Sequence, residues 1–194
     1  KSGGTITLEF PHLMRLIEQA QFDTVYHEHF SYFSLYTVCQ IFGVAGLRIY
    51  DVEELTTHGG SLRVYVCHEE DQRKTQQSVN TLLNQEASFG LQKLQIYFDF
   101  QPRADKIKYD LLSFLIEQKH KGKIVAAYGA AAKGNTLLNY AGVKPDLLPF
   151  VSDAARAKQG KLMPGSHIPI LTHEIIKKKR PDFILILPWN IKNE

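Results

Sequence analysis

Residues 22–36 carry the densest set of proton-transfer groups in the 194-residue chain. The stretch reads FDTVYHEHFSYFSLY, and Tyr26, His27, Glu28 and His29 stand in an unbroken row within it. Imidazole and carboxylate groups move protons efficiently when a partly dry site holds them beside a reacting atom. The composition therefore predicts a general acid or base among these side chains, with the neighbouring aromatic rings excluding water.

The grouping of these side chains depends on the backbone. In a helix, Tyr26 and His29 would share one face with Phe33, while Glu28 and Tyr32 would share another. In an extended strand, Tyr26 and Glu28 would point to one side and the two histidines to the other. A buried aromatic core is an equally valid interpretation. A metal site is disfavoured and none is expected, because neither H-E-x-x-H spacing nor a nearby cysteine or carboxylate cluster is present.

The first half of the chain reads as strands and helices in alternation. Ser34 is placed to cap a helix that ends at Gly46. Two polar helical stretches follow and form a connector, and Pro102 is expected to kink or break the second of them. The expected strands are 5–10, 47–51 and 62–68, and the expected helices are the stretch after Pro11, 34–45, 70–87 and 91–119.

The pattern after residue 123 is typical of a small parallel sheet. Strands are expected at 124–128, 150–153 and 183–187, and helices at 135–140 and 173–179. Such alternation predicts a Rossmann-like fold, with Asp153 near the place of the acidic residue that follows its second strand. The fold class is α/β, with three parts: 1–70 as the end of a catalytic α/β domain, 71–120 as a helical connector, and 121–194 as a Rossmann-like domain.

Two loops of this last part are candidates for ligand contact. Gly129 to Gly134 leads from a strand into a helix, so its backbone N–H groups and Lys133 suit a diphosphate or carboxylate. The structural alternative is a close-packed turn with Lys133 in solvent. Residues 161–170 read as a rigid irregular loop, and His167 and Asn190 lie where ligands of open parallel sheets gather.

Composition and charge exclude several classes of protein. No run of about 18 apolar residues is present, and the first residues lack a secretory signal, so no membrane partner is expected and a cytoplasmic location is the default. The net charge is +3, and the basic run at 177–180 suits a solvated helix end better than a nucleic-acid surface. Cys39 and Cys67 are expected to be ordinary packed thiols.

Four ordered motifs resemble one known family. The stretch FDTVYHEHFSYFSL, then HGGSLRVYV at 58–66, YGAAAKGNTLLNYAG at 128–142, and KQGKLMPGSHIPI with PDFILILPWN cover nearly the whole chain. Together they are similar to the S-adenosylmethionine-dependent sugar C-methyltransferases that act on nucleotide-linked 4-keto-6-deoxy sugars. The glycine-rich loop that would hold S-adenosyl-L-methionine is not in this sequence. The chain is therefore expected to be the C-terminal part of a longer enzyme, to partner an N-terminal remainder, and to be inactive alone.

The resemblance implies a chemical role for the aromatic stretch. His29 would be the base that removes the proton beside the sugar's keto group, with Tyr26 and Glu28 aiding orientation and stabilisation of the enolate. Glu28 would either hold the second imidazole nitrogen or position the substrate. The partner is a nucleotide-linked keto-deoxy sugar, and no nucleic acid. The candidate substrate-binding residues are His27, Tyr32, His58, Gly129, Lys133, Asn135, His167 and Asn190.

Two other functions remain open at this point. One is a non-catalytic nucleotide-binding or regulatory Rossmann-like module, which predicts that residues 22–36 are buried and dry with no cleft reaching them. The other is a dehydrogenase, but the G-A-A-A-K-G loop is not the G-x-G-x-x-G fingerprint that binds a dinucleotide.

Overall fold

The structure, a computed structural model, describes residues 3–191, which form two compact units. The first unit contains the chain up to residue 21 and residues 30–101. The second contains residues 22–29 and the chain from residue 102 onward. The row of proton-transfer groups therefore packs with the second unit, although it interrupts the sequence of the first.

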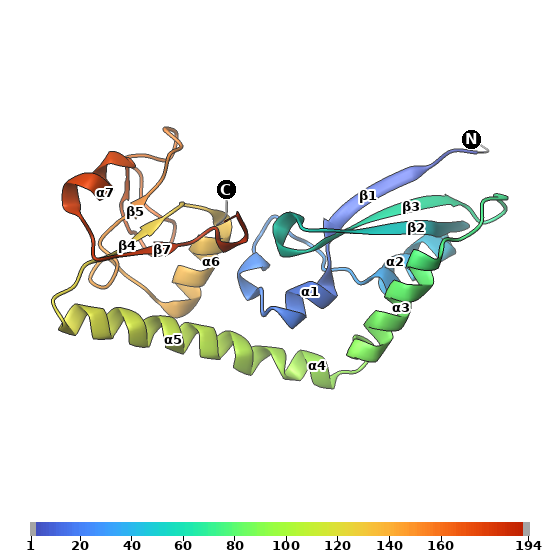
Figure 1. Ribbon diagram of the computed structural model, residues 1–194, viewed down its shortest axis with the longest axis horizontal. Coiled ribbons are helices and arrows are strands. Elements are labelled where there is room, and N and C mark those ends of the chain that lie inside the picture. The colour runs from blue at the N-terminus through green and yellow to red at the C-terminus, as the bar shows by residue number, and fades with distance from the viewer. Residues whose placement is uncertain (1–2, 192–194) are drawn as a thin grey trace. The chain divides into compact units, whose positions relative to one another are not determined.

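The first unit is a three-stranded antiparallel sheet with helices packed on it (Figure 1). The sheet order is β1-β3-β2, so β3 is the central strand. Its residues Leu62, Val64 and Val66 are completely buried. Helices α2 and α3 both pack on β2 and on each other. The elements are β1 (Ile6–Pro11), α1 (Leu13–Glu18), α2 (Leu35–Val44), β2 (Leu47–Leu55), β3 (Ser61–His68) and α3 (Gln77–Phe89).

Local capping chemistry sets the limits of α2, as the sequence predicts. The Ser34 hydroxyl oxygen accepts a hydrogen bond from the Thr37 backbone N–H at 3.0 Å, which satisfies one of the unpaired donors of the first turn. Gly46 follows the last turn with φ +69°, a conformation in which glycine has no steric penalty. The expected helix and its two ends are confirmed.

The connector is broken where the sequence predicts. Helix α4 (Gln95–Phe98) is separated from α5 (Phe100–His120) by Asp99. Pro102 has no N–H for the Phe98 carbonyl, and its ring would crowd that oxygen, so the regular bonding stops just before α5. Within α5 itself Pro102 occupies the first turn, where a backbone donor is not needed. No helix among residues 3–191 is both long and apolar enough to cross a membrane.

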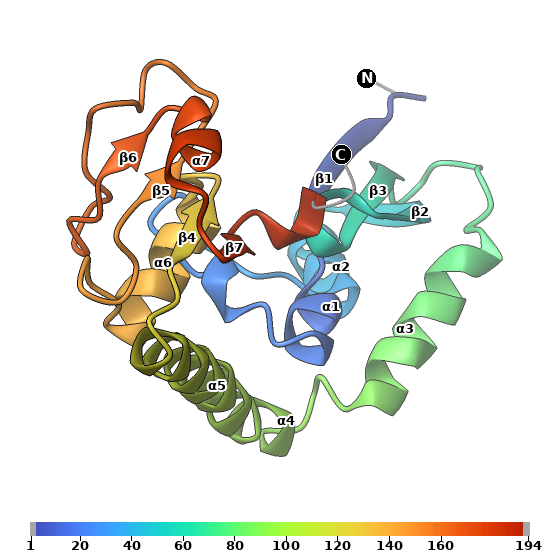
Figure 2. The ribbon, with the colours of Figure 1, turned by 60° about the vertical axis from the view of Figure 1, so that its left-hand side comes forward.

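The second unit is a parallel sheet of four strands, in the order β6-β5-β4-β7 (Figure 2). This is the strand order of a Rossmann-like half, in which the first strand lies between the second and the fourth. The α/β class and the parallel sheet are thus confirmed. The elements are β4 (Val125–Tyr128), α6 (Ala132–Ala141), β5 (Val151–Ser152), β6 (Ile170–Leu171), α7 (Glu174–Lys179) and β7 (Phe183–Ile186).

Two details of this unit differ from the expectation. Helix α6 begins at Ala132, three residues before the predicted start, because the alanines of the loop favour helix and no proline or β-branched residue stops it earlier. The predicted irregular loop 161–170 ends in strand β6, which pairs with β5 through Val151 and Ile170. A strand of two residues is too short for a periodic signal.

Candidate active site

The stretch with the proton-transfer groups is neither a helix nor a strand. It begins with the 3₁₀ turn η1 (Phe22–Thr24), and a second turn follows that is closed by the His29 backbone N–H donating to the Tyr26 carbonyl at 3.0 Å. Because of this turn, the Tyr26 ring lies near the rings of both His27 and His29. Neither of the two face assignments considered for a regular backbone applies.

His29 is held with a defined tautomer. Its Nδ1 lies 2.9 Å from the Thr24 carbonyl oxygen, which can only accept, so Nδ1 carries the proton. In the neutral ring the lone pair therefore resides on Nε2, the state that a general base requires. The Tyr26 ring lies beside the imidazole, with ring centroids 4.4 Å apart and an interplanar angle of 35°. Tyr26 and His29 are both half-buried.

Glu28 and His27 point toward solvent. Their side chains are 68% and 88% exposed, and Glu28 Oε1 lies 4.0 Å from His27 Nε2, too far for a hydrogen bond. The Thr24 carbonyl occupies the position on His29 Nδ1 that a carboxylate would take. Glu28 is therefore not the group that holds this nitrogen, and its other predicted role, positioning of the substrate, stays a prediction.

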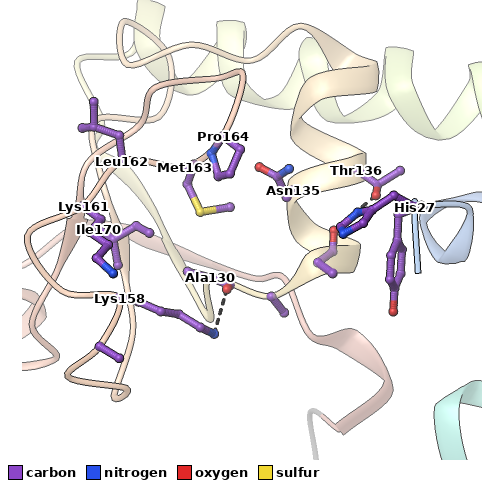
Figure 3. Close-up of a pocket in the computed structure, with 14 residues that line it drawn as sticks. His27, Ala130, Asn135, Thr136, Lys158, Lys161, Leu162, Met163, Pro164 and Ile170 are labelled. Atoms are coloured by element: carbon purple, nitrogen blue, oxygen red, sulfur yellow. Dashed lines mark hydrogen bonds between the residues drawn. The ribbon is translucent and has the colours of Figure 1, made fainter. Parts of the chain in front are cut away.

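A cavity of about 340 Å³ opens beside this turn, within the second unit (Figure 3). Its size is in the range of small-molecule sites, and its wall is mainly apolar with a few polar groups, as is usual for such sites. Tyr26 and His27 form part of the wall. The other lining residues are Ala130, Ala131, Ala132, Asn135, Thr136, Ala157, Lys158, Lys161, Leu162, Met163, Pro164 and Ile170.

The polar groups of the cavity suit an anionic ligand with hydrogen-bonding edges. Lys158 Nζ donates to the Ala130 carbonyl at 2.9 Å, as Figure 3 shows, and also lies 3.4 Å from Asp153 Oδ2, which offsets part of its charge. Lys161 adds a second cation to the wall. Asn135 Oδ1 is buried and has no hydrogen-bond partner within residues 3–191. An unsatisfied buried acceptor is costly, so Asn135 is the polar group of this wall that most needs a ligand donor.

The start of α6 forms another part of the wall. Its N-cap residue Ala131 has the extended backbone typical of a cap, φ −94° and ψ 159°, but it offers no side-chain acceptor to the first turn. Ala131 and Ala132 both line the cavity. The positive end of the helix dipole is therefore directed at the cavity without a capping side chain of the protein.

The usual dinucleotide contacts of a Rossmann fold are occupied by the protein itself. Asp153 accepts backbone hydrogen bonds from Ala130 N and Ala155 N, both at 2.7 Å, so its carboxylate is not presented to a ribose. At the crevice between β4 and β7, a Cβ on Gly129 would lie 2.5 Å from Pro188 Cδ. This close packing leaves no room for a side chain at position 129. The bonded Asp153 carboxylate and the missing fingerprint both argue against a dehydrogenase.

Lys133 lies in a buried cluster and is not among the residues that line the cavity in the described part of the chain. Its side chain is 7% exposed, and Nζ lies 4.7 Å from the centroid of the Trp189 ring. The Trp189 indole N–H donates to Asp23 Oδ2 at 2.6 Å. Burial raises the pKa of the Asp23 carboxyl group and lowers the pKa of the Lys133 amine, while each charge acts against the shift of the other.

The remaining predicted site residues lie elsewhere. Tyr32 and His58 belong to the first unit: Tyr32 packs against its core, and His58 is exposed in a loop with φ +57°. His167 is exposed in the second unit, and Asn190 is half-buried in the turn η3 (Trp189–Ile191). Three of the predicted site residues therefore line the cavity: Tyr26, His27 and Asn135.

Several residues of the site are absent from the sequence-based prediction. Lys158 and Lys161 come from the loop after β5, and Asp23 and Thr24 precede the tyrosine of the signature. The only sequence signal for the lysines is their position after a parallel strand, where ligand-binding loops occur. Asp23 and Thr24 stand inside the signature motif, but nothing local indicates that a carbonyl there meets His29.

The fold and the site define an α/β protein in which Tyr26 and His27 line a cavity of small-molecule size. Residues 56–194 match the family described as C-methyltransferase C-terminal domain, and the chain belongs to that family. It is also 37% identical over 191 residues to the C-methyltransferase NovU of Streptomyces niveus. That match covers 98% of this chain and 46% of NovU, so the chain spans about half the length of its curated relative.

Proposed function

We propose that this chain is the substrate-side part of an S-adenosylmethionine-dependent C-methyltransferase that deprotonates and methylates the carbon alpha to the keto group of a nucleotide-linked 4-keto-deoxy sugar. The family and the relative support methyl transfer to carbon. The observation that carries the proposal is the hydrogen bond from His29 Nδ1 to the Thr24 carbonyl, beside a cavity of ligand size.

The geometry supports proton removal by His29. In the neutral ring Nε2 would take the proton from the carbon next to the ketone, and the electron pair of that C–H bond would form the enolate. The imidazolium so produced keeps its Nδ1–H hydrogen bond to the Thr24 carbonyl. Tyr26 stacks beside this ring, and its hydroxyl is our candidate donor to the enolate oxygen, as the resemblance implies. Glu28 would position the sugar.

The cavity is our candidate for the nucleotide part of the substrate. Its apolar wall suits a base and a ribose, and Asn135 presents an amide with an unsatisfied oxygen. Lys158, Lys161 and the positive end of α6 favour the diphosphate. Tyr26 and His27 form one side of the wall, so a sugar attached to this nucleotide would extend toward the turn that carries His29. His58, His167 and Asn190 stay predicted contacts of the substrate.

Residues 3–191 do not provide a recognisable site for S-adenosyl-L-methionine. The acidic residue after the second parallel strand, Asp153, is bonded to the backbone, and Pro188 fills the space against Gly129. The adenosyl group would need both places if it bound as nucleotides do in this fold. The described residues therefore do not fit this donor, and the chemistry that we derive for the chain is limited to substrate binding and proton transfer.

One observation argues against the non-catalytic alternative. A regulatory module predicts a buried aromatic stretch that no cleft reaches, whereas Tyr26 and His27 line the cavity and the side chain of His27 is 88% exposed. Two of the four groups, Tyr26 and His27, are thus accessible in the second unit.

The test replaces His29 in the enzyme that carries this chain. His29→Ala should lower turnover by about 10²–10⁴, the usual contribution of a general base, and leave substrate affinity within a few fold. It should also suppress exchange of the alpha proton of a nucleotide-linked 4-keto-6-deoxy sugar with solvent deuterium, measured by NMR with a non-methylating analogue of the donor.

His27→Ala is the matched control, because it removes the same side chain two positions away. It should alter substrate affinity at most and keep the proton exchange. If exchange and turnover persist in His29→Ala, His29 is not the base and the proposed mechanism is wrong.

A further inference from the structure

A buried polar cluster lies beneath the turn that carries His29. Asp23 is 5% exposed and receives the Trp189 indole N–H at 2.6 Å, a hydrogen bond between residues 166 positions apart in the sequence. Lys133, itself buried, lies over the ring of the same tryptophan. Burying two ionisable groups is costly, and an apolar core of the same shape is often no less stable. The proposed role of His29 leaves this cluster without a function.

The cluster is connected to the base through one residue. Asp23 belongs to η1 and is followed directly by Thr24, whose carbonyl oxygen accepts the His29 Nδ1 hydrogen bond. On the other side of Asp23, the Phe22 ring packs on Tyr140 of α6, with centroids 5.0 Å apart. The three residues of η1 thus have distinct contacts: Phe22 packs on Tyr140, Asp23 binds the Trp189 indole, and Thr24 binds the imidazole.

We propose that Asp23 and Trp189 are positioning residues for His29. The hydrogen bond between them fixes the orientation of η1, so that the Thr24 carbonyl faces Nδ1 and the lone pair of the neutral ring stays on Nε2. Lys133 lies over the same ring, and its positive charge favours an Asp23 carboxylate that accepts the indole N–H strongly. The inference rests on the proposed function of His29, but its structural content can be tested without turnover.

A displaced carbonyl would have a specific effect on the imidazole. Without an acceptor in line with Nδ1, the neutral ring would distribute its proton between the two nitrogens, and the fraction with a basic Nε2 would fall. A small misplacement of a catalytic group is enough to lower a rate by up to about 100-fold. A purely structural role for the cluster would alter stability and leave the tautomer unchanged.

The test measures the tautomer of His29 by ¹⁵N NMR of the imidazole in the 194-residue chain. Trp189→Phe retains an aromatic ring near Lys133 and removes the N–H donor. We expect the Nδ1–H signal of the neutral ring to be dominant in the wild type and to be lost or averaged in Trp189→Phe. In the enzyme that carries the chain, the rate of alpha-proton exchange should fall roughly 10- to 100-fold with KM changed at most a few fold.

Tyr140→Phe is the matched control. It removes a hydrogen bond from an aromatic side chain to a carboxylate, that of Tyr140 to Asp105, in the same unit, and it keeps the ring that packs on Phe22. The tautomer of His29 should stay as in the wild type. An unchanged tautomer in Trp189→Phe, or an equal change in Tyr140→Phe, would overturn the inference.

Variants of Asp23 keep the inference testable if Trp189→Phe does not fold. Asp23→Asn retains an oxygen that can accept the indole N–H and should preserve the tautomer. The double variant Asp23→Leu/Trp189→Phe removes both partners, so no buried acceptor loses its donor, and it should lose the tautomer. The opposite results would contradict the role of this hydrogen bond.

The two proposals fail in different ways. If the wild-type enzyme shows no alpha-proton exchange, the proposed function fails, while the tautomer of His29 in the variants still decides the role of Asp23 and Trp189. If exchange occurs and neither it nor the tautomer responds to Trp189→Phe, the proposed function stands and the positioning role is wrong.

Discussion

Two helix starts, one in each unit, use the same physical property differently. The first turn of any α-helix has unpaired backbone donors and a partial positive charge. In α2 the Ser34 hydroxyl accepts from Thr37 N, and the Glu86 carboxylate accepts from Leu35 N at 2.6 Å and Tyr36 N at 2.9 Å. In α6 the cap residue is Ala131, which provides no side-chain acceptor. One helix start is completed by the protein, and the other lines a cavity.

Glu86, the acid at the start of α2, is bound by groups of its own unit. Glu86 is 1% exposed, and its Oε1 also lies 2.8 Å from His12 Nε2, a buried imidazole nitrogen. Its three hydrogen bonds all go to groups of its own unit, so the Glu86 carboxylate has a structural role. The difference from α6 shows that a buried acid or a helix start suggests a site only where the protein leaves its bonding capacity unused.

The largest effect that we expect is the loss of stability when the completed start of α2 is opened. Glu86→Ala removes the acceptor for two backbone N–H groups, of which that of Leu35 is buried, and for the buried His12. Breaking a buried pair by removing one partner costs about 3–5 kcal/mol, so the free energy of unfolding should fall by about that amount. Urea unfolding followed by circular dichroism would measure it.

Glu54→Ala is the control for the removal of a charge as such. Glu54 pairs with Arg15 at the surface of the same unit, and an exposed pair contributes about 0–1 kcal/mol. A Glu86→Ala variant as stable as Glu54→Ala would mean that the buried carboxylate does not complete α2, and the comparison between the two helix starts would lose its basis.

A second and smaller effect is expected when the open start of α6 is closed. Ala131→Asp places a carboxylate at an extended cap position, where it should accept from the first turn and stabilise the unit by roughly 0.5–1 kcal/mol. The same charge would repel a diphosphate in the cavity, so the affinity for a nucleoside diphosphate should fall about tenfold. Thermal unfolding should therefore show a gain in stability, and calorimetric titration should show a loss of affinity.

Ala131→Ser separates the cap from the charge. Its hydroxyl can accept from the same turn without repelling an anion, so the variant should gain stability and keep the affinity within a few fold. If Ala131→Asp binds the nucleoside diphosphate as tightly as Ala131→Ser does, the phosphates do not lie at the start of α6.

The parts of the fold that the sequence predicted are those with local causes. The limits of α2 follow from a serine cap and a glycine stop, and the break before α5 follows from Pro102, each within a few residues. The parallel sheet follows from apolar strands that alternate with helices. Strand β6 was not predicted, because two residues such as Ile170 and Leu171 form a strand only through pairing with β5.

The site was predicted less well because its geometry depends on distant residues. The row from Tyr26 to His29 is evident in the sequence, but its turn depends on η1, whose Asp23 is bonded to Trp189. Lys133 was expected at a ligand because it stands at a helix start. In the structure its amine lies over the Trp189 ring. A contact between Lys133 and a substrate stays a prediction.

The smallest effect that we expect concerns Asn135, one turn into α6. Its Oδ1 is buried without a partner among residues 3–191, so Asn135→Ala should not lower the free energy of unfolding and can raise it slightly. If the amide binds a ligand in the cavity, its loss should weaken the affinity for a nucleoside diphosphate by about 1 kcal/mol, the usual net value of one hydrogen bond. Thermal unfolding and calorimetric titration measure the two quantities.

Asn139 is the matched residue one turn further along α6, and it separates a structural amide from a binding one. Its Nδ2 donates to the Pro164 carbonyl at 2.9 Å, so Asn139→Ala should lower the free energy of unfolding by about 1 kcal/mol. The two asparagines should therefore rank in opposite order, with Asn139 important for stability and Asn135 for affinity. An Asn135→Ala variant that is destabilised and binds as the wild type does would show that Asn135 has a structural role, and the nucleotide would have to be placed elsewhere.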